Sequence, residues 1–107
     1  IGPTGAAEIA EYVSGSGVLK TLYLNGNKIG DEGAKAIGGA LADNAGLTNL
    51  VLYGNRIGNE GAKALAAALR VNEVLKNIDL SYNNLGDEGR KAIHDAVSGR
   101  EGFELEM

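Results

Sequence analysis

The 107-residue chain has no cysteine and no tryptophan, and it has a single proline and a single histidine. Without cysteine it can form neither a disulfide framework nor a thiolate zinc site, a composition that suits a reducing compartment, so we predict a cytoplasmic location. A formal net charge of −4 gives no basic stripe of the kind that nucleic acids bind. No apolar run approaches the ~20 residues that span a bilayer. We therefore expect neither a nucleic acid nor a membrane as partner.

What the chain has instead is a sequence that repeats every 28 residues. Complete copies occupy 19–46, 47–74 and 75–102. Residues 1–18 match the second half of a copy, and residues 103–107 match the beginning of one with its apolar positions shifted. Such a period is the signature of a solenoid, in which each unit buries its apolar side against the next. We predict a single repeat domain, and the start within a repeat suggests a piece of a longer protein.

The first half of each copy follows the pattern LxxLxL, filled in the first complete copy by Leu19, Leu22 and Leu24. The final LxL has the two-residue alternation of a strand, so each copy is expected to begin with a strand of about five residues. An asparagine follows three residues later in every copy. Because asparagine side chains bond backbone groups where a chain leaves a strand, we predict a structural ladder of side chains running between repeats. The ladder residues are Asn27, Asn55 and Asn83.

The second half of each copy opens with GDEG or GNEG and continues with apolar residues at helical spacing. Asp31, Asn59 and Asp87 stand where a helix needs an N-cap oxygen, so each is expected to cap the helix that it opens. In the partial copy Pro3 takes that place, and Thr4 is expected to cap instead. A column of glycines in the first turn indicates close approach to the neighbouring repeat. The column consists of Gly5, Gly33, Gly61 and Gly89.

Together these residues, LxxLxLxxNxIGDEGAKAI, resemble the leucine-rich repeat family, and within it the ribonuclease-inhibitor-like subtype, whose repeats pair a strand with a full helix. The resemblance implies an α/β fold, a right-handed β-α superhelix with a short curved parallel sheet on the concave face and helices on the convex face. Strands pack ~4.8 Å apart and helices ~8–10 Å apart, so the stack must curve with its strands inside. The resemblance also implies a role in binding another protein, whose identity it does not indicate.

Side chains between the buried leucines should point into this concavity and form a protein-binding surface. Tyrosines are the strongest candidates because they offer a broad ring and a hydroxyl with little entropy to lose, although aromatic residues on strands also serve cross-strand packing alone. The last three residues of the set are expected along one rim. The predicted binding residues are Thr21, Tyr23, Asn25, Asn49, Val51, Tyr53, Asn77, Asp79, Ser81, Tyr82, Lys28 and Arg56.

The pattern does not predict an enzyme, and we assign no catalytic, cofactor-binding or metal-binding residue. The single histidine, His94, is expected on the outer side of the third full helix near Asp95. Neither a cysteine nor a second histidine completes a metal set with them, and no nucleophile is paired with a base. The carboxylates at the helix starts are explained by capping.

Two other functions stay open. A catalytic regulator similar to Ran GTPase-activating proteins would accelerate single-turnover GTP hydrolysis, and unchanged rates across a panel of small GTPases would count against it. Alternatively, the edge strand near Leu19 and the strand near Phe103 could join copies of the chain into a homo-oligomer through the ends of the solenoid. A constant monomer mass in sedimentation across a concentration series would rule this out.

Overall fold

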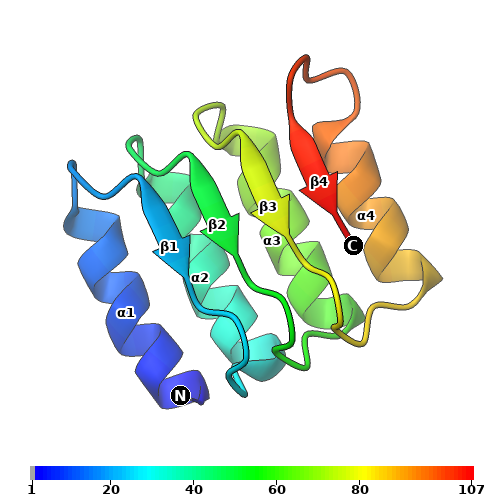
Figure 1. Cartoon of the computed structure of the whole chain (residues 1–107), viewed down its shortest axis with the longest axis horizontal. Helices are drawn as coiled ribbons and strands as arrows, with labels where there is room; N and C mark the ends of the chain where they lie inside the picture. Colours follow the sequence, from blue (N-terminus) through cyan, green and yellow to red (C-terminus); the bar gives the residue numbers. More distant parts are fainter. Residues whose placement is uncertain (1) are drawn as a thin grey trace.

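The computed structural model describes residues 2–107, in which four helices alternate with four strands. In chain order the elements are α1 (Pro3–Gly15), β1 (Thr21–Tyr23), α2 (Gly30–Asp43), β2 (Asn49–Val51), α3 (Asn59–Val71), β3 (Asn77–Asp79), α4 (Asp87–Val97) and β4 (Glu104–Glu106). The strands form one parallel sheet in the order β1-β2-β3-β4, and the helices lie side by side behind it (Figure 1). The predicted α/β solenoid of strands and helices is confirmed.

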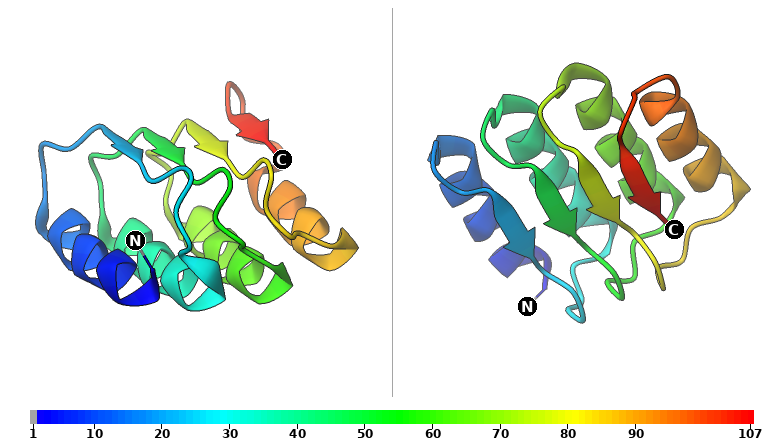
Figure 2. Two further views of the ribbon diagram at one scale, coloured as in Figure 1. Left: turned by 60° about the horizontal axis from the view of Figure 1, so that its bottom comes forward. Right: turned by 45° about the horizontal axis from the view of Figure 1, so that its top comes forward.

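The sheet and the helices form two layers, which Figure 2 shows from two further directions. Each strand has three residues instead of the expected five. Backbone pairing nevertheless continues past the strand ends: the Leu24 N–H donates to the Val51 carbonyl at 2.9 Å, and the Gly26 N–H donates to the Tyr53 carbonyl at 2.9 Å. The backbone pairing between neighbouring repeats is therefore longer than the strands themselves.

The repeating leucines and isoleucines fill the space between the layers. They come from the strands, from the loops and from the inner sides of the helices, so they join each repeat to the next. Burying one such side chain contributes about 1.5–3 kcal/mol relative to leaving it in water. Among residues 2–107, the largest fully buried side chains are Ile29, Leu41, Leu47, Leu50, Leu52, Ile57, Leu65, Leu69, Leu75, Ile78, Leu80 and Ile93. None of the helices in that range is both long enough and apolar enough to cross a membrane.

The asparagine ladder at the strand exits is confirmed. In the middle repeat, Asn55 Nδ2 donates to the Leu24 carbonyl at 2.8 Å and to the Leu52 carbonyl at 3.0 Å. Its Oδ1 accepts the Asn27 N–H at 3.1 Å. Asn83 repeats this one step further along and accepts the Asn55 N–H at 2.9 Å. Asn55 and Asn83 thus satisfy backbone groups of their own repeat and of the preceding one.

A second ladder, which the sequence reasoning did not single out, lies where the helices return to the strands. Asn44 is buried, donates from Nδ2 to the Val13 carbonyl at 2.8 Å, and accepts the Leu47 N–H at 2.6 Å. Asn72 makes the equivalent bonds in the following repeat. In the last repeat Arg100 takes this place, with its guanidinium bonded to the Leu69 and Leu75 carbonyls and 4.8 Å from the centre of the Phe103 ring.

The prediction that the Asp and Asn residues of the GDEG and GNEG motifs cap the helices that they open is wrong. Asp31 Oδ1 does not bond its own helix; it accepts the N–H groups of Gly58 at 2.7 Å and Gly61 at 3.0 Å, at the start of α3. Asn59 Oδ1 accepts the equivalent N–H groups at the start of α4, those of Gly86 and Gly89. The starts of α3 and α4 are therefore each satisfied by a side chain of the preceding repeat.

The position of these residues within their helices explains the difference. Asn59 and Asp87 are the first helical residues of α3 and α4, and Asp31 is the second of α2, so none of them is an N-cap residue. Asp87 is exposed and caps no helix among residues 2–107. Thr4 lies inside α1, which begins at Pro3, and it also fails to form the expected cap. Proline at the first helical position needs no hydrogen-bond partner for a backbone N–H.

We expect Asp31→Ala to lower the free energy of unfolding by about 1–2 kcal/mol, because it leaves two N–H groups of α3 without their acceptor. Asp87→Ala is the matched control, since it removes the same side chain from the same place in an exposed setting and should change stability by less than about 0.5 kcal/mol. Urea unfolding followed by circular dichroism measures both. Equal losses in the two variants would contradict capping between repeats.

Candidate functional site

The predicted binding residues on the strands lie in two rows across the sheet. Residues of one row pair in register: Thr21 with Asn49, and Asn49 with Asn77. Tyr23, Val51 and Asp79 form the second row in the same way. The residues between the rows, Leu22, Leu50 and Ile78, belong to the core, so the row residues face away from the helices. Sequence spacing thus identified a contiguous surface, which we call the strand face.

Exposure varies across the strand face. The Tyr23 side chain is 67% exposed, whereas Val51 and Asp79 in the same row are half-buried. Asn25, Tyr53 and Ser81 follow just past the strands, with Tyr53 41% exposed. Tyr23 and Tyr53 therefore offer apolar rings to a partner on a surface that is otherwise mostly polar.

One polar atom on the strand face lacks a partner within residues 2–107. Asn49 Oδ1 is buried and accepts no hydrogen bond there, although Asn49, the first residue of β2, lies between Thr21 and Asn77 of the neighbouring strands. Leaving a buried acceptor unsatisfied costs about 1–3 kcal/mol.

Beyond the strand face lies the rim, the turns that carry Lys28, Arg56 and Tyr82. Both cations are exposed, and neither forms an ion pair with any other part of the described chain. The Tyr82 ring is 87% exposed and lies edge-to-face on Tyr53, with ring centres 6.1 Å apart and an angle of 70°. This aromatic pair joins the rim to the strand face.

Two rim residues have backbone conformations that favour glycine. Arg56 has φ +60° and Tyr82 has φ +58°, and these are the non-glycine residues with positive φ among residues 2–107. In the preceding repeats the place of Tyr82 is held by Gly26 and Gly54, with φ +72° and +71°. A side chain in this conformation costs about 1–2 kcal/mol. The sequence alone showed that tyrosine replaces glycine here but not that the conformation is retained.

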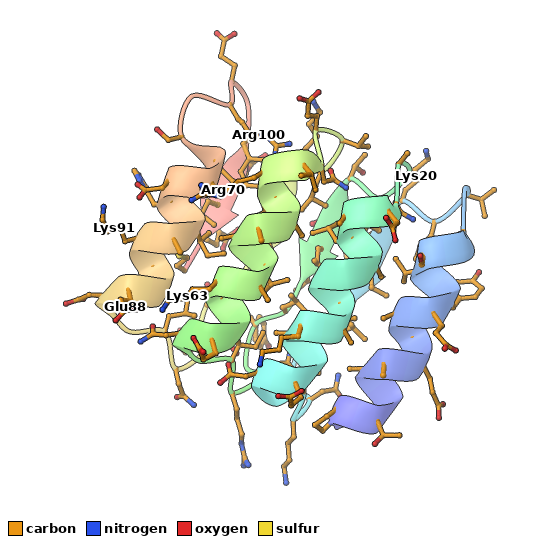
Figure 3. All side chains as sticks on the ribbon, turned by 180° about the vertical axis from the view of Figure 1, so that it is seen from behind. Lys20, Lys63, Arg70, Glu88, Lys91 and Arg100 are labelled. Atoms are coloured by element: carbon orange, nitrogen blue, oxygen red, sulfur yellow. The ribbon has the colours of Figure 1, made fainter. Side chains whose placement is uncertain are left out.

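The helix layer carries ion pairs instead. Lys63 of α3 lies 2.5 Å from Glu88 of α4 and 3.8 Å from Glu60, and Figure 3 shows Lys63 and Glu88 beside each other. Their mutual hydrogen bond lowers the pKa of Glu88 and raises the pKa of Lys63. Both side chains are exposed, so water screens the pair and it adds little to stability. His94 is exposed on α4, as expected.

A surface hollow of about 370 Å³ lies away from the strand face, where α3 and α4 return to β3 and β4. Arg70, Lys76 and Arg100 line it together with Glu73 and Glu101, so the charges are mixed. The Arg100 guanidinium is already bonded to two backbone carbonyls. None of the predicted binding residues lines this hollow.

A repeating strand–helix unit with an asparagine after β1, β2 and β3 defines a class of solenoid, and sequence comparison agrees. A sequence profile described as "Leucine Rich repeat" matches residues 18–38, 43–66 and 71–93, which together make up more than half of the chain. The protein therefore belongs to the leucine-rich repeat family. A search of curated protein sequences finds no significant match.

Two solved structures share the fold. The structure titled "Leiomodin-1 Actin-Binding Site 2 (ABS2)" superposes with a TM-score of 0.85 at 23% sequence identity, over 99% of this chain and 63% of that one. The tropomodulin C-terminal domain of Caenorhabditis elegans superposes with a TM-score of 0.78 at 14% identity, over 95% of this chain and 61% of that one. At such identities the likeness concerns the fold. The chain spans less than two thirds of the length of either structure.

Proposed function

We propose that this chain is a protein-interaction module that binds another protein through its strand face. The observation that carries the proposal is the exposure of Tyr23 and Tyr53 on a surface whose backbone is fixed by two side-chain ladders. Rigid aromatic anchors lose little entropy on binding.

We also propose that the repeats are of the ribonuclease-inhibitor-like subtype with a 28-residue unit. Two features support this assignment: each described strand except the last is followed by a helix of at least 11 residues, and Asn27 N–H bonds Asn55 28 residues away. A cytoplasmic location and a binding role without cofactor or catalysis belong to the same proposal.

The size of the strand face limits its affinity. Four strands at ~4.8 Å spacing present about 300 Å², whereas a standard interface takes about 800 Å² from each partner. Binding by these residues alone should be weak unless neighbouring surfaces also contribute. The actin-binding site named in the leiomodin title makes actin the first partner to test.

The double variant Tyr23→Ala/Tyr53→Ala is expected to weaken partner binding at least about tenfold, because both aromatic anchors are lost. Cosedimentation with actin filaments and pull-down of proteins from a lysate measure it. Tyr12→Ala is the matched control, since Tyr12 is 65% exposed but belongs to α1 in the helix layer. Retained binding in the double variant, with loss in Tyr12→Ala, would place the interface on the opposite layer.

Self-assembly through the ends is the weaker alternative, because the free side of α4 differs from the packed sides of the other helices. The place that Ala34 and Ala62 hold against the glycine of the next helix is occupied on α4 by Arg90. Gly38 packs on the backbone of α3, and its place on α4 is taken by His94. Both side chains are exposed, and another helix could approach as closely only by displacing them. We expect a constant monomer mass in sedimentation.

A further inference from the structure

The rim turn after β3 retains a glycine conformation without retaining glycine. Tyr82 keeps the positive φ of Gly26 and Gly54, and its ring remains almost entirely in water. Burial therefore does not offset the strain of this conformation. Strained residues of this kind concentrate at binding sites, where the side chain has a use that the free protein does not reveal.

Arg56 lies beside this turn and has the same unusual conformation. Asn83 Oδ1 accepts the N–H groups of Asn55 and Ile57, the two neighbours of Arg56, each at 2.9 Å. These bonds hold the turn around Arg56 against the turn around Tyr82. The Tyr53–Tyr82 pair and a guanidinium without an ion pair in the described chain thus share one edge of the molecule.

We propose that Tyr53, Arg56 and Tyr82 form a recognition patch, the tyrosine rim, that binds an extended acidic peptide segment of a partner protein. The Arg56 guanidinium would bind a carboxylate of the peptide through a bidentate pair of hydrogen bonds. The two tyrosine rings would contact a neighbouring apolar side chain of the peptide. Lys28, in the adjacent repeat, is a second exposed cation without an ion pair in the described chain and favours further acidic residues in the same segment.

A short peptide fits this patch better than a nucleic acid does. Two cations on a chain of net charge −4 would neutralise few phosphates, whereas one or two carboxylates match them in number. The inference rests on the proposed role in protein binding, but it concerns the rim and leaves Tyr23 out. Its failure can therefore be separated from failure of the strand face.

The test is a titration of the full chain, followed by amide chemical shifts, with a blocked hexapeptide in which glutamate alternates with leucine. We expect shifts confined to residues 53–57 and 81–84, and no comparable shifts with a hexapeptide that has lysine in place of glutamate. Tyr82→Gly and Arg56→Gly should each weaken binding at least tenfold without lowering the thermal midpoint, because glycine suits both conformations. Arg70→Ala, which removes an exposed cation of α3 in the helix layer, should leave binding unchanged.

Several results would overturn the proposal. Unmoved amides at the rim, equal binding of the lysine peptide, or stronger binding of a single-stranded oligonucleotide would each do so. A lower midpoint of Tyr82→Gly with unchanged peptide affinity would show that the ring only packs against Tyr53, and would also overturn it. If the peptide binds as expected while the single variant Tyr23→Ala keeps every lysate partner, the rim stands and the role of the strand face fails.

Discussion

Asn55→Ala is expected to lower the free energy of unfolding by about 3 kcal/mol, a large fraction of the 5–15 kcal/mol typical of a small domain. The side chain is 0% exposed, so water cannot replace its hydrogen bonds. Its removal leaves the Asn27 N–H without its acceptor and takes a donor from the Leu24 and Leu52 carbonyls. It also leaves a cavity between two repeats. Chemical unfolding in urea gives the magnitude.

Two further variants separate hydrogen bonding from loss of volume. Asn55→Asp preserves the size of the side chain but turns a carboxylate oxygen toward two carbonyl oxygens, so it should destabilise at least as much as alanine. Asn84→Ala removes an exposed asparagine next to the ladder and should cost less than about 0.5 kcal/mol. A tolerated Asn55→Asp would show that the ladder contributes packing alone.

The second large effect is expected at Gly61, where alanine should cost about 2–3 kcal/mol. A Cβ atom there would lie 2.8 Å from Asp31 Oδ1 and 2.9 Å from Ala34 Cβ, so α2 and α3 would have to separate. The separation would also stretch the bonds that Asp31 makes to the start of α3. The same substitution at Gly39, in α2, meets no atom within 4 Å and should stabilise by about 0.5–1 kcal/mol through helix propensity.

Thermal unfolding of the two glycine variants compares them under identical conditions. The opposite signs are the essential result, because both changes add one methyl group to a helix. Stabilisation by both, or loss of stability in both, would mean that spacing between helices does not determine the glycine column. A smaller loss at Gly61, with the sign preserved, would indicate that the helices relax around the methyl group.

The fold and the asparagine ladder could be predicted from the sequence because each depends on residues that recur at one interval. Asn27, Asn55 and Asn83 are identical in every copy, and their side-chain chemistry permits few roles at a strand exit. The second ladder was missed because its column is not uniform. Ser16 and Arg100 occupy it at the ends, and only Asn44 and Asn72 match between them.

The remaining errors concern geometry that composition does not encode. Capping residues were recognised by their type. Whether Asp31 bonds its own helix or the next one depends on the residue at which α2 begins, and α2 begins one residue before Asp31. For the candidate site, alternation along the strands correctly placed the strand-face residues in register. The positive φ of Arg56 and Tyr82 could not be read from residue type, because both residues normally avoid that conformation.

The two kinds of contact between repeats run in opposite directions along the chain. A helix start depends on the repeat before it, as α3 depends on Asp31, whereas a strand exit depends on the repeat after it, as Asn27 depends on Asn55. If the repeat at either end unfolded, backbone N–H groups in the neighbouring repeat would consequently lose their hydrogen-bond acceptors. Although every unit touches only its neighbours, melting of the stack should be all-or-none, without stepwise fraying from one preferred terminus.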